Sequence, residues 1–369
     1  MKNSQIPLLK PYISPHSEIF QELEKVFNSG YIAAGDTVKE FEAAFAKYIG
    51  NDPKNVVAVS SCTAALHLAL LLSGASPGTR VISTPMTAEP TNLAILHAGA
   101  DIVWADTRWD NGNISWNDAR QKITRKTVAV VGVDYGGIPC FSENTRTIPP
   151  DIAIIQDAAH SLGARWDGMK MGTRRLADFT TFSLQAVKSL TTGDGGVLVC
   201  NVPGDADMAR ELRWFGINRE ASRTEVDIKR VGYKYDMNNI TAAMGLVQLR
   251  HIDEVIGRQI ENGKWFAKNL CHGISAYVSP VADPSYWLYT LILEDSRERD
   301  RLSYELTKAG IGNGLCHRRN DLHTVFTRYK ANLPGLDEFY SRMLHIPCGW
   351  WVGDGDREYI KETIDNVLA

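Results

Sequence analysis

The sequence predicts an α/β protein in which a mostly parallel β-sheet is covered by helices and is followed by a smaller C-terminal α+β unit. Strand-like apolar runs alternate with helical stretches along the first half of the chain, and several of the runs are almost free of polar residues. Strands buried on both faces have this pattern, which is typical of a parallel sheet between two layers of helices. The length of 369 residues also suits two domains.

The expected elements follow one another in a regular order. A strand over Val56–Ser61 precedes a helix over Thr63–Ala75 that is rich in Ala and Leu. Helical stretches up to Leu96 and near Ser115–Ile123 separate later strands. The further strand candidates are Arg80–Pro85, Asp101–Asp106, Thr127–Asp134, Ile152–Ala158, Asp178–Leu184 and Gly195–Cys200.

The remainder of the chain predicts a second domain. One long helix is expected from Asn239 to about Leu270, with an apolar side, and it leads to a C-terminal α+β unit that contains residues 287–293, 300–309 and 358–368. We place the boundary near residue 245. Residues 1–245 then form the large domain, and residues 246–369 form the small one.

Composition excludes several classes of protein. The net charge of −3 offers no basic surface for nucleic acid, and no run of about 18 apolar residues predicts a membrane span. The N-terminal stretch MKNSQIPLLKPYISP lacks the apolar segment of a signal peptide. The six cysteines form no CxxC pair, so neither a metal site nor a disulfide framework is expected. These features predict a cytoplasmic protein.

A single lysine stands out in FSLQAVKSLTTGDGGVLVC, residues 182–200. Lys188 lies on the connector between two predicted strands and has apolar neighbours. Desolvation at such a place would lower the pKa of the ammonium and free the amine to attack a carbonyl. A solvated surface lysine fits the same pattern.

Two other stretches place polar groups where a ligand can bind. SSCTAALHLAL puts Ser61, Cys62 and Thr63 at a strand-to-helix junction, where the free N–H groups of a first helical turn attract an anion. In IIQDAAHSLGA, Asp157 ends a buried strand, and ligands of open α/β sheets bind at such carboxyl ends. An ordinary helix N-cap and an aspartate that caps a loop are the alternatives.

These groups together suit one ligand. Asp157 can pair with a cationic ring nitrogen, and the small Ala159 lets a flat ring lie against it. Ser183 can reach a phosphate, and Lys188 can capture an aldehyde. Pyridoxal phosphate has a ring nitrogen, a flat ring, a phosphate and an aldehyde, and its pyridinium ring acts as an electron sink. No GxGxxG motif follows a strand and opens a helix, so a nicotinamide site is not predicted.

The motifs resemble, in order, those of the DegT/DnrJ/EryC1/StrS aminotransferases, which act on nucleotide-linked keto sugars. Besides the three stretches above, the resemblance includes GYIAAGDTVKEFEAAFAKYIG, VISTPMTAEPTNLAILHAGADIVWAD and GYKYDMNNITAAMGLVQL, so it covers nearly the whole chain. It implies a homodimeric enzyme of pyridoxal-phosphate fold type I whose active sites are shared between the subunits.

The resemblance also assigns roles to particular residues. Lys188 is expected to form a Schiff base with the cofactor, and Asp157 to pair with the pyridinium. Ser183 and the turn Cys62–Thr63–Ala64 are expected to hold the phosphate. His160, where many members have Gln, is expected beside the ring hydroxyl.

Three positions depart from the family pattern. Many members have an aromatic residue stacked on the cofactor where this chain has Ala88 and Glu89. Members commonly send an asparagine from the neighbouring subunit to the phosphate. Here Lys234 and Asp236 are the candidates, and the cation of Lys234 is the better phosphate ligand. Asp194 replaces a common Glu, a change that we expect to matter little.

A reaction follows from the resemblance. Glutamate is the usual donor, and its amine displaces Lys188, which then moves a proton between substrate and cofactor. A nucleotide-linked keto sugar accepts the amino group in the second half of a ping-pong cycle. The products of such reactions are amino sugars, including those of polysaccharides and O-antigens.

Two stretches are candidates for the sugar-nucleotide site. NGLCHRRNDLH, residues 313–323, contains His317, Arg318 and Arg319, and guanidinium groups suit a diphosphate. LRWFGINRE, residues 212–220, offers Trp214 for stacking on a base or sugar. A solvated charged loop and an aromatic core residue are the respective alternatives.

Two other functions are compatible with this fold. Some relatives are sugar dehydratases in which a histidine replaces the lysine, so Lys188 argues against that function. A non-catalytic regulator is the other alternative, and the presence of both Lys188 and Asp157 argues against it.

Overall fold

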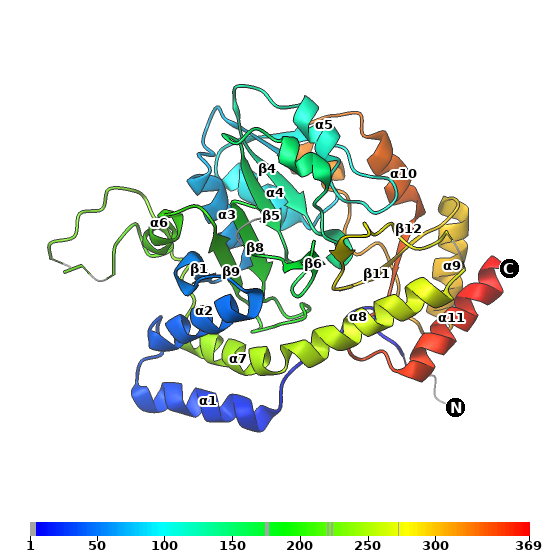
Figure 1. Ribbon diagram of the computed structural model, residues 1–369, viewed down its shortest axis with the longest axis horizontal. Coiled ribbons are helices and arrows are strands. Elements are labelled where there is room, and N and C mark those ends of the chain that lie inside the picture. The colour runs from blue at the N-terminus through cyan, green and yellow to red at the C-terminus, as the bar shows by residue number, and fades with distance from the viewer. Residues whose placement is uncertain (1–4, 174–176, 220, 223, 272) are drawn as a thin grey trace.

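A seven-stranded, mostly parallel sheet forms the centre of the molecule, with strand order β1-β9-β8-β5-β4-β2-β3 (Figure 1). The computed structural model describes residues 5–173, 177–219, 221–222, 224–271 and 273–369. Strand β9 runs antiparallel to β1 and β8, while the series β8-β5-β4-β2-β3 is parallel throughout. The predicted fold class is confirmed. The strands are β1 (Val56–Val59), β2 (Arg80–Ser83), β3 (Asp101–Trp104), β4 (Thr127–Val133), β5 (Ala153–Asp157), β8 (Phe179–Ser183) and β9 (Gly196–Cys200).

Apolar side chains cover both faces of this sheet, which explains the uninterrupted apolar runs. Val57 and Val59 of β1 face one core, and Val56 and Ala58 face the other, because side chains alternate along a strand. The first core includes α3 (Cys62–Leu72), α4 (Glu89–His97) and α6 (Asp205–Leu212). The second includes α2 (Asp36–Ile49), α5 (Trp116–Gln121) and α7 (Asn239–Arg250).

The long helix expected from Asn239 to about Leu270 is two helices, so that prediction was wrong in one respect. Helix α7 ends at Arg250, and α8 runs over Ile252–Asn269. Between them His251 has φ −104° and ψ 0°, and its Nε2 lies 3.0 Å from Glu18 Oε1 of α1 (His16–Ser29). The break lets α7 pack on α1 and α2 while α8 continues towards α11 (Figure 1).

The C-terminal part has a core of its own. Strands β11 (Tyr289–Ile292) and β12 (Met343–Ile346) pair antiparallel, and α9 (Ser296–Lys308), α10 (Pro334–Arg342) and α11 (Asp354–Leu368) lie nearby. Ile6, near the start of the described chain, belongs to this core and pairs with Ile311 through a β-bridge.

A small sheet joins β10 (Ala282–Asp283), β6 (Arg165–Trp166) and β7 (Met169–Lys170). The division into domains at residue 245 stays a prediction. Short 3₁₀ helices cover Pro53–Asn55, Tyr135–Gly137, Glu143–Thr147, Asn320–Leu322 and Thr324–Phe326.

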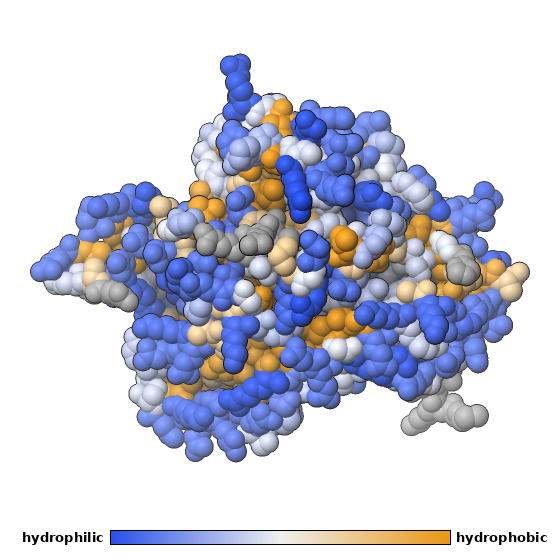
Figure 2. Space-filling view, in the orientation of Figure 1, coloured by the Kyte–Doolittle hydropathy of each residue, from blue (hydrophilic) through white to orange (hydrophobic). Residues whose placement is uncertain are grey.

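The face of the molecule in Figure 2 is mostly hydrophilic, and apolar side chains are visible on it in the region of α2 and α7. Among the residues that the structure describes, no helix combines the length and the hydropathy needed to cross a membrane.

Candidate active site

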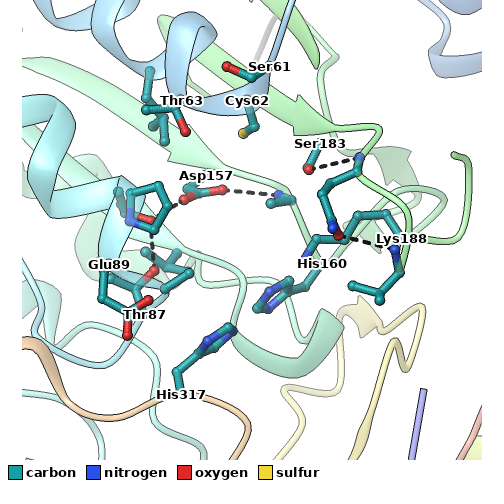
Figure 3. Close-up of a pocket in the computed structure, with 18 of the residues that line it drawn as sticks. Ser61, Cys62, Thr63, Thr87, Glu89, Asp157, His160, Ser183, Lys188 and His317 are labelled. Atoms are coloured by element: carbon teal, nitrogen blue, oxygen red, sulfur yellow. Dashed lines mark hydrogen bonds between the residues drawn. The ribbon is translucent and has the colours of Figure 1, made fainter. Parts of the chain in front are cut away.

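One pocket of about 420 Å³ opens near the carboxyl ends of the parallel strands. Side chains from the ends of β4, β5 and β8, from the start of α3 and from the C-terminal part of the chain meet there (Figure 3). This is the position at which open α/β sheets bind ligands. The predicted site residues that line it are Cys62, Thr63, Asp157, Ala159, His160, Ser183, Lys188 and His317.

The start of α3 forms one wall of the pocket. Ser61 is the N-cap, and its Oγ accepts a hydrogen bond from the amide of Ala64 at 3.1 Å. The Ala64 amide is thus used by the cap, and Ala64 is not among the lining residues, whereas Cys62 and Thr63 are. A Cβ on Gly196 would lie 2.4 Å from the Ser61 carbonyl carbon, so only glycine lets β9 pass this close to the helix start.

Asp157 ends β5 and is almost fully buried, with 4% of its surface exposed. Its Oδ2 accepts a hydrogen bond from Thr91 Oγ1 at 2.7 Å, and its Oδ1 accepts one from the amide of Ala159 at 3.1 Å. Burial raises the pKa of this carboxyl, and the two hydrogen bonds and the charge of Lys188 oppose the rise. The carboxylate is therefore held in a fixed orientation and favours a cationic partner.

Lys188 follows the end of β8 and points into the same pocket (Figure 3). Its backbone amide donates to the Gln185 carbonyl at 2.9 Å, which turns the chain directly after Ser183 and Leu184. Burial lowers the pKa of Lys188 to about 8, and the negative charge of Asp157 opposes this shift. An amine with this pKa is partly unprotonated near neutral pH and can attack a carbonyl.

Two histidines form the opposite wall, and Figure 3 shows them across the pocket from Ser61, Cys62 and Thr63. The rings of His160 and His317 are nearly parallel, with centroids 5.5 Å apart and an angle of 6°. Burial and the nearby charge of Lys188 lower the pKa of His317 to about 4, and the pKa of His160 is also well below its usual value. Both rings are therefore neutral at pH 7.

Two predicted residues lie outside the pocket of their own chain. Lys234 pairs with Asp236, and its Nζ lies 4.3 Å from the ring centroid of Trp214. Arg219 lies over the same indole, at 4.4 Å. Neither Trp214 nor Lys234 lines the pocket.

The two arginines predicted to bind substrate also lie outside it. Arg319 forms ion pairs with Asp321, at 2.8 Å, and with Asp337. Arg318 donates to the carbonyl of Leu322 at 3.2 Å. Of this stretch, Cys316 and His317 reach the pocket wall.

The stretch is attached to the wall by a buried pair of amides. Asn92 Nδ2 donates to Asn320 Oδ1 at 2.8 Å, and Asn320 Nδ2 donates to the Thr87 carbonyl at 2.8 Å. Both asparagines are fully buried. These bonds join α4 to the C-terminal part of the chain and so fix the distance between Thr87 and His317 across the site.

Sequence reasoning missed several lining residues, namely Leu9, Thr91, Trp287 and Cys316. Leu9 and Trp287 lie in no motif that indicates chemistry, whereas Thr91 and Cys316 lie in stretches that the sequence analysis singled out for other residues. Ala88, Glu89 and Asp194, which depart from the family pattern, do line the pocket. Glu89 Oε1 lies 3.4 Å from His323 Nε2, at the place where many members have an aromatic ring.

The model of the DegT/DnrJ/EryC1/StrS aminotransferase family matches residues 14–365. The chain belongs to this family. It is thus an aminotransferase of a pyridoxal-phosphate-dependent family, as its motifs predicted.

Relatives of known structure share the whole fold. AtS13 from Actinomadura melliaura is 35% identical with a TM-score of 0.92, over 99% of this chain and 100% of that one. The sugar aminotransferase CalS13 from Micromonospora echinospora is 34% identical with the same TM-score, over 98% and 99% of the two chains. The sugar aminotransferase Spr1654 from Streptococcus pneumoniae, described as putative, has been solved in a PMP form, with 26% identity, a TM-score of 0.89 and coverage of 99% of both chains. The spore coat polysaccharide biosynthesis protein SpsC from Bacillus subtilis is 30% identical over 100% of this chain and 98% of its own length.

Proposed function

We propose that this aminotransferase binds pyridoxal phosphate at Lys188 and moves an amino group from glutamate to the keto group of a nucleotide-linked sugar. One observation carries the proposal. The half-buried Lys188 and the buried carboxylate of Asp157 at a strand end face the same pocket beside the first turn of a helix. Covalent capture, charge stabilisation and phosphate binding each need one of these features.

The residues present fit this cofactor. Nδ1 of His160 is buried and has no hydrogen-bond partner within the described part of the chain, so it is available to a ring hydroxyl. The two groups that donate hydrogen bonds to Asp157, the Thr91 hydroxyl and the Ala159 amide, are both uncharged. The charge of the carboxylate is therefore available to a ring nitrogen. Ala159 is small enough to lie under a ring, and Thr63 and Ser183 line the side that suits a phosphate.

When bound, pyridoxal phosphate supplies an aldehyde for the amine and a cationic ring that accepts electrons. In our proposal, Asp157 holds the proton on the ring nitrogen, because its carboxylate raises the pKa of that nitrogen. Thr91 and the Ala159 amide fix the direction of the carboxylate. Lys188 would take the proton from the substrate carbon that bears the amino group and deliver it to the carbon on the other side of that nitrogen, so one amine serves both half-reactions in a ping-pong order.

The substrate class rests on the relatives. CalS13 is a sugar aminotransferase and SpsC belongs to spore coat polysaccharide biosynthesis, and the chain covers nearly the full length of both. We infer an amino sugar as the product, with His317 on the sugar side of the pocket.

We infer further that the active unit is a homodimer. The cluster of Trp214, Arg219 and Lys234 carries two cations but contributes nothing to the pocket of its own chain. In the proposed dimer, Lys234 reaches the phosphate of the partner's site, while Arg318, Arg319 and Trp214 meet the nucleotide.

A half-reaction assay tests this function. Purified holoenzyme is mixed with glutamate, and 2-oxoglutarate is measured in a single turnover. Nucleotide-linked 3-keto and 4-keto sugars are then supplied in turn, and the amino sugar is identified by mass spectrometry. We expect one 2-oxoglutarate per site and one preferred sugar. Transfer from glutamate with no sugar accepted would reject the substrate class, and the absence of any transfer would reject the function.

A further inference from the structure

The indole of Trp287 lies against the lysine of the pocket. Nζ of Lys188 is 3.8 Å from the centroid of the Trp287 ring, which is close contact for a cation–π pair. Nε1 of the indole donates to the carbonyl of Val187 at 2.9 Å, so the ring also holds the backbone next to the lysine. Trp287 stacks on His160, with centroids 3.9 Å apart and an angle of 20°.

The backbone around Trp287 is fixed as firmly as its ring. The amide of Leu288 donates to the Gly136 carbonyl at 3.2 Å, and the amide of Ser285 donates to the Gly137 carbonyl at 3.1 Å. A Cβ on Gly137 would lie 2.8 Å from the backbone nitrogen of Trp287, so the backbones of the two segments are in direct contact. Trp287 itself is only 4% exposed. Its indole therefore cannot follow Lys188 if the lysine moves, and it acts as a fixed surface.

Trp287 and Lys188 also separate two cavities. Both line the active-site pocket, and both line a much smaller cavity behind it, together with Lys10, Tyr12 and Trp350. The smaller cavity is almost filled, at about 10 Å³. The lysine side chain thus has room on the pocket side alone, with the indole at its back.

Two other effects act on the same ammonium. Burial disfavours its protonated form, and the nearby carboxylate of Asp157 favours that form. The indole face adds a favourable contact that does not depend on the titration of Asp157.

We propose that Trp287 is a positioning residue for Lys188, and that its indole holds the lysine ammonium whenever the amine is not bonded to the cofactor. In a ping-pong cycle this happens in every turnover, after the donor has displaced the lysine. The indole then keeps the amine beside the reacting carbon and limits the positions that it can take. This inference rests on the proposed role of Lys188.

The test measures cofactor capture by the apoprotein as a function of pH. Capture condenses the lysine amine with the aldehyde and releases one water, and only the unprotonated amine reacts, so the initial rate of appearance of visible absorbance reports the pKa of Lys188. Two rings of nearly the same shape are placed at position 287. Trp287→Phe keeps an electron-rich face, whereas pentafluorophenylalanine presents an electron-poor one.

We expect the Phe variant to keep a midpoint near that of the wild type. The fluorinated variant should capture the cofactor with a midpoint about half a unit to one unit lower, because its ammonium loses the cation–π contact. Trp265→Phe is the matched control, since Trp265 has a cation–π contact with Arg357 at 5.3 Å and does not line the pocket. It should leave the midpoint unchanged.

Equal midpoints for the Phe and fluorinated variants, with normal capture at Lys188, would overturn the role of Trp287 alone. Failure of the wild-type protein to capture the cofactor at Lys188 would overturn the proposed function and this inference with it. Should the fluorinated variant not fold, the comparison of wild type with Trp287→Leu is decisive in the same way, with the same lower midpoint expected.

Discussion

Burial acts in opposite directions on the two ionisable groups at the centre of the pocket. It raises the pKa of the Asp157 carboxyl and lowers the pKa of Lys188 to about 8. In both cases the charged form is less stable than in water, because the surroundings replace little of the lost solvation. A ligand that brings a cation to Asp157 and a carbonyl to Lys188 relieves both costs, and the proposed cofactor, pyridoxal phosphate, has both of these groups.

Asp157→Asn should keep the fold and bind the cofactor, yet transfer the glutamate amino group slower by on the order of a hundredfold or more. The amide retains the size of the side chain but carries no charge to hold the ring proton. Single-turnover formation of 2-oxoglutarate measures the rate. Asp207→Asn, in an exposed pair with Arg210, is the control and should be unaffected. A rate within a few-fold of wild type would reduce Asp157 to a structural cap.

Thr91→Val should slow the same step by about tenfold, because a hydrogen bond to a charged group is lost while the Ala159 amide still holds the other carboxylate oxygen. Thr91→Ser keeps the hydroxyl and should recover most of the rate. The visible spectrum of the bound cofactor gives a second reading, since a misdirected carboxylate changes ring protonation. Identical rates for the Val and Ser variants would show that Thr91 merely packs.

At the scale of elements, the site depends on how closely β9 approaches the start of α3. Gly196 allows this approach, since a Cβ there would lie 2.5 Å from the Cys62 nitrogen. The first turn of α3 is the proposed phosphate cradle, so crowding at Gly196 acts on cofactor binding directly.

Gly196→Ala should weaken cofactor binding at least tenfold and lower the free energy of unfolding by about 1–3 kcal/mol, through displacement of the helix start. Equilibrium titration with the cofactor and denaturant unfolding measure the two effects. Gly257→Ala is the matched control: Gly257 lies inside α8 with nothing within 4 Å of the added Cβ, so it should stabilise slightly and leave binding unchanged. Unaltered affinity in the first variant would place the phosphate elsewhere.

Sequence patterns located the elements well where one local rule applied. The buried strands were predicted because both of their faces are apolar. Asp157 was found because it ends a buried strand, and Lys188 because it lies on the connector after one. The break at His251 was not predicted, since apolar residues continue through Ile252 and Val255 and only the contact with Glu18 of α1 marks it. Thr91 was missed for a related reason, as its partner Asp157 lies 66 residues away.

At the scale of the whole molecule, the pocket combines the sheet with side chains from the far end of the chain. Trp287 and Cys316 were not predicted as site residues, and the Asn92–Asn320 pair attaches the segment that contains Cys316 and His317 to the wall. The family resemblance placed His317 near the substrate. It did not show that Arg318 and Arg319 are engaged with their own chain.

The proposed sharing of sites between subunits gives a complementation test. Lys188→Ala and Lys234→Glu should each be inactive as homodimers. If Lys234 serves the partner's site, a mixed dimer has one site with both lysines intact, and random exchange restores about a quarter of wild-type activity. No recovery after confirmed exchange would place Lys234 in the site of its own chain, and a fully active Lys234→Glu homodimer would remove it from the site.

The most direct test of the account is to trap the cofactor on the protein. The holoenzyme is reduced with borohydride, digested, and searched by mass spectrometry for the peptide that carries the pyridoxyl group. The account predicts that the label is on Lys188. The Lys188→Ala variant should carry no label, although its phosphate and ring contacts still retain the cofactor. Treatment of the wild-type protein with glutamate before the reduction should also prevent labelling. A label on another lysine, or normal transamination by Lys188→Ala, would contradict it.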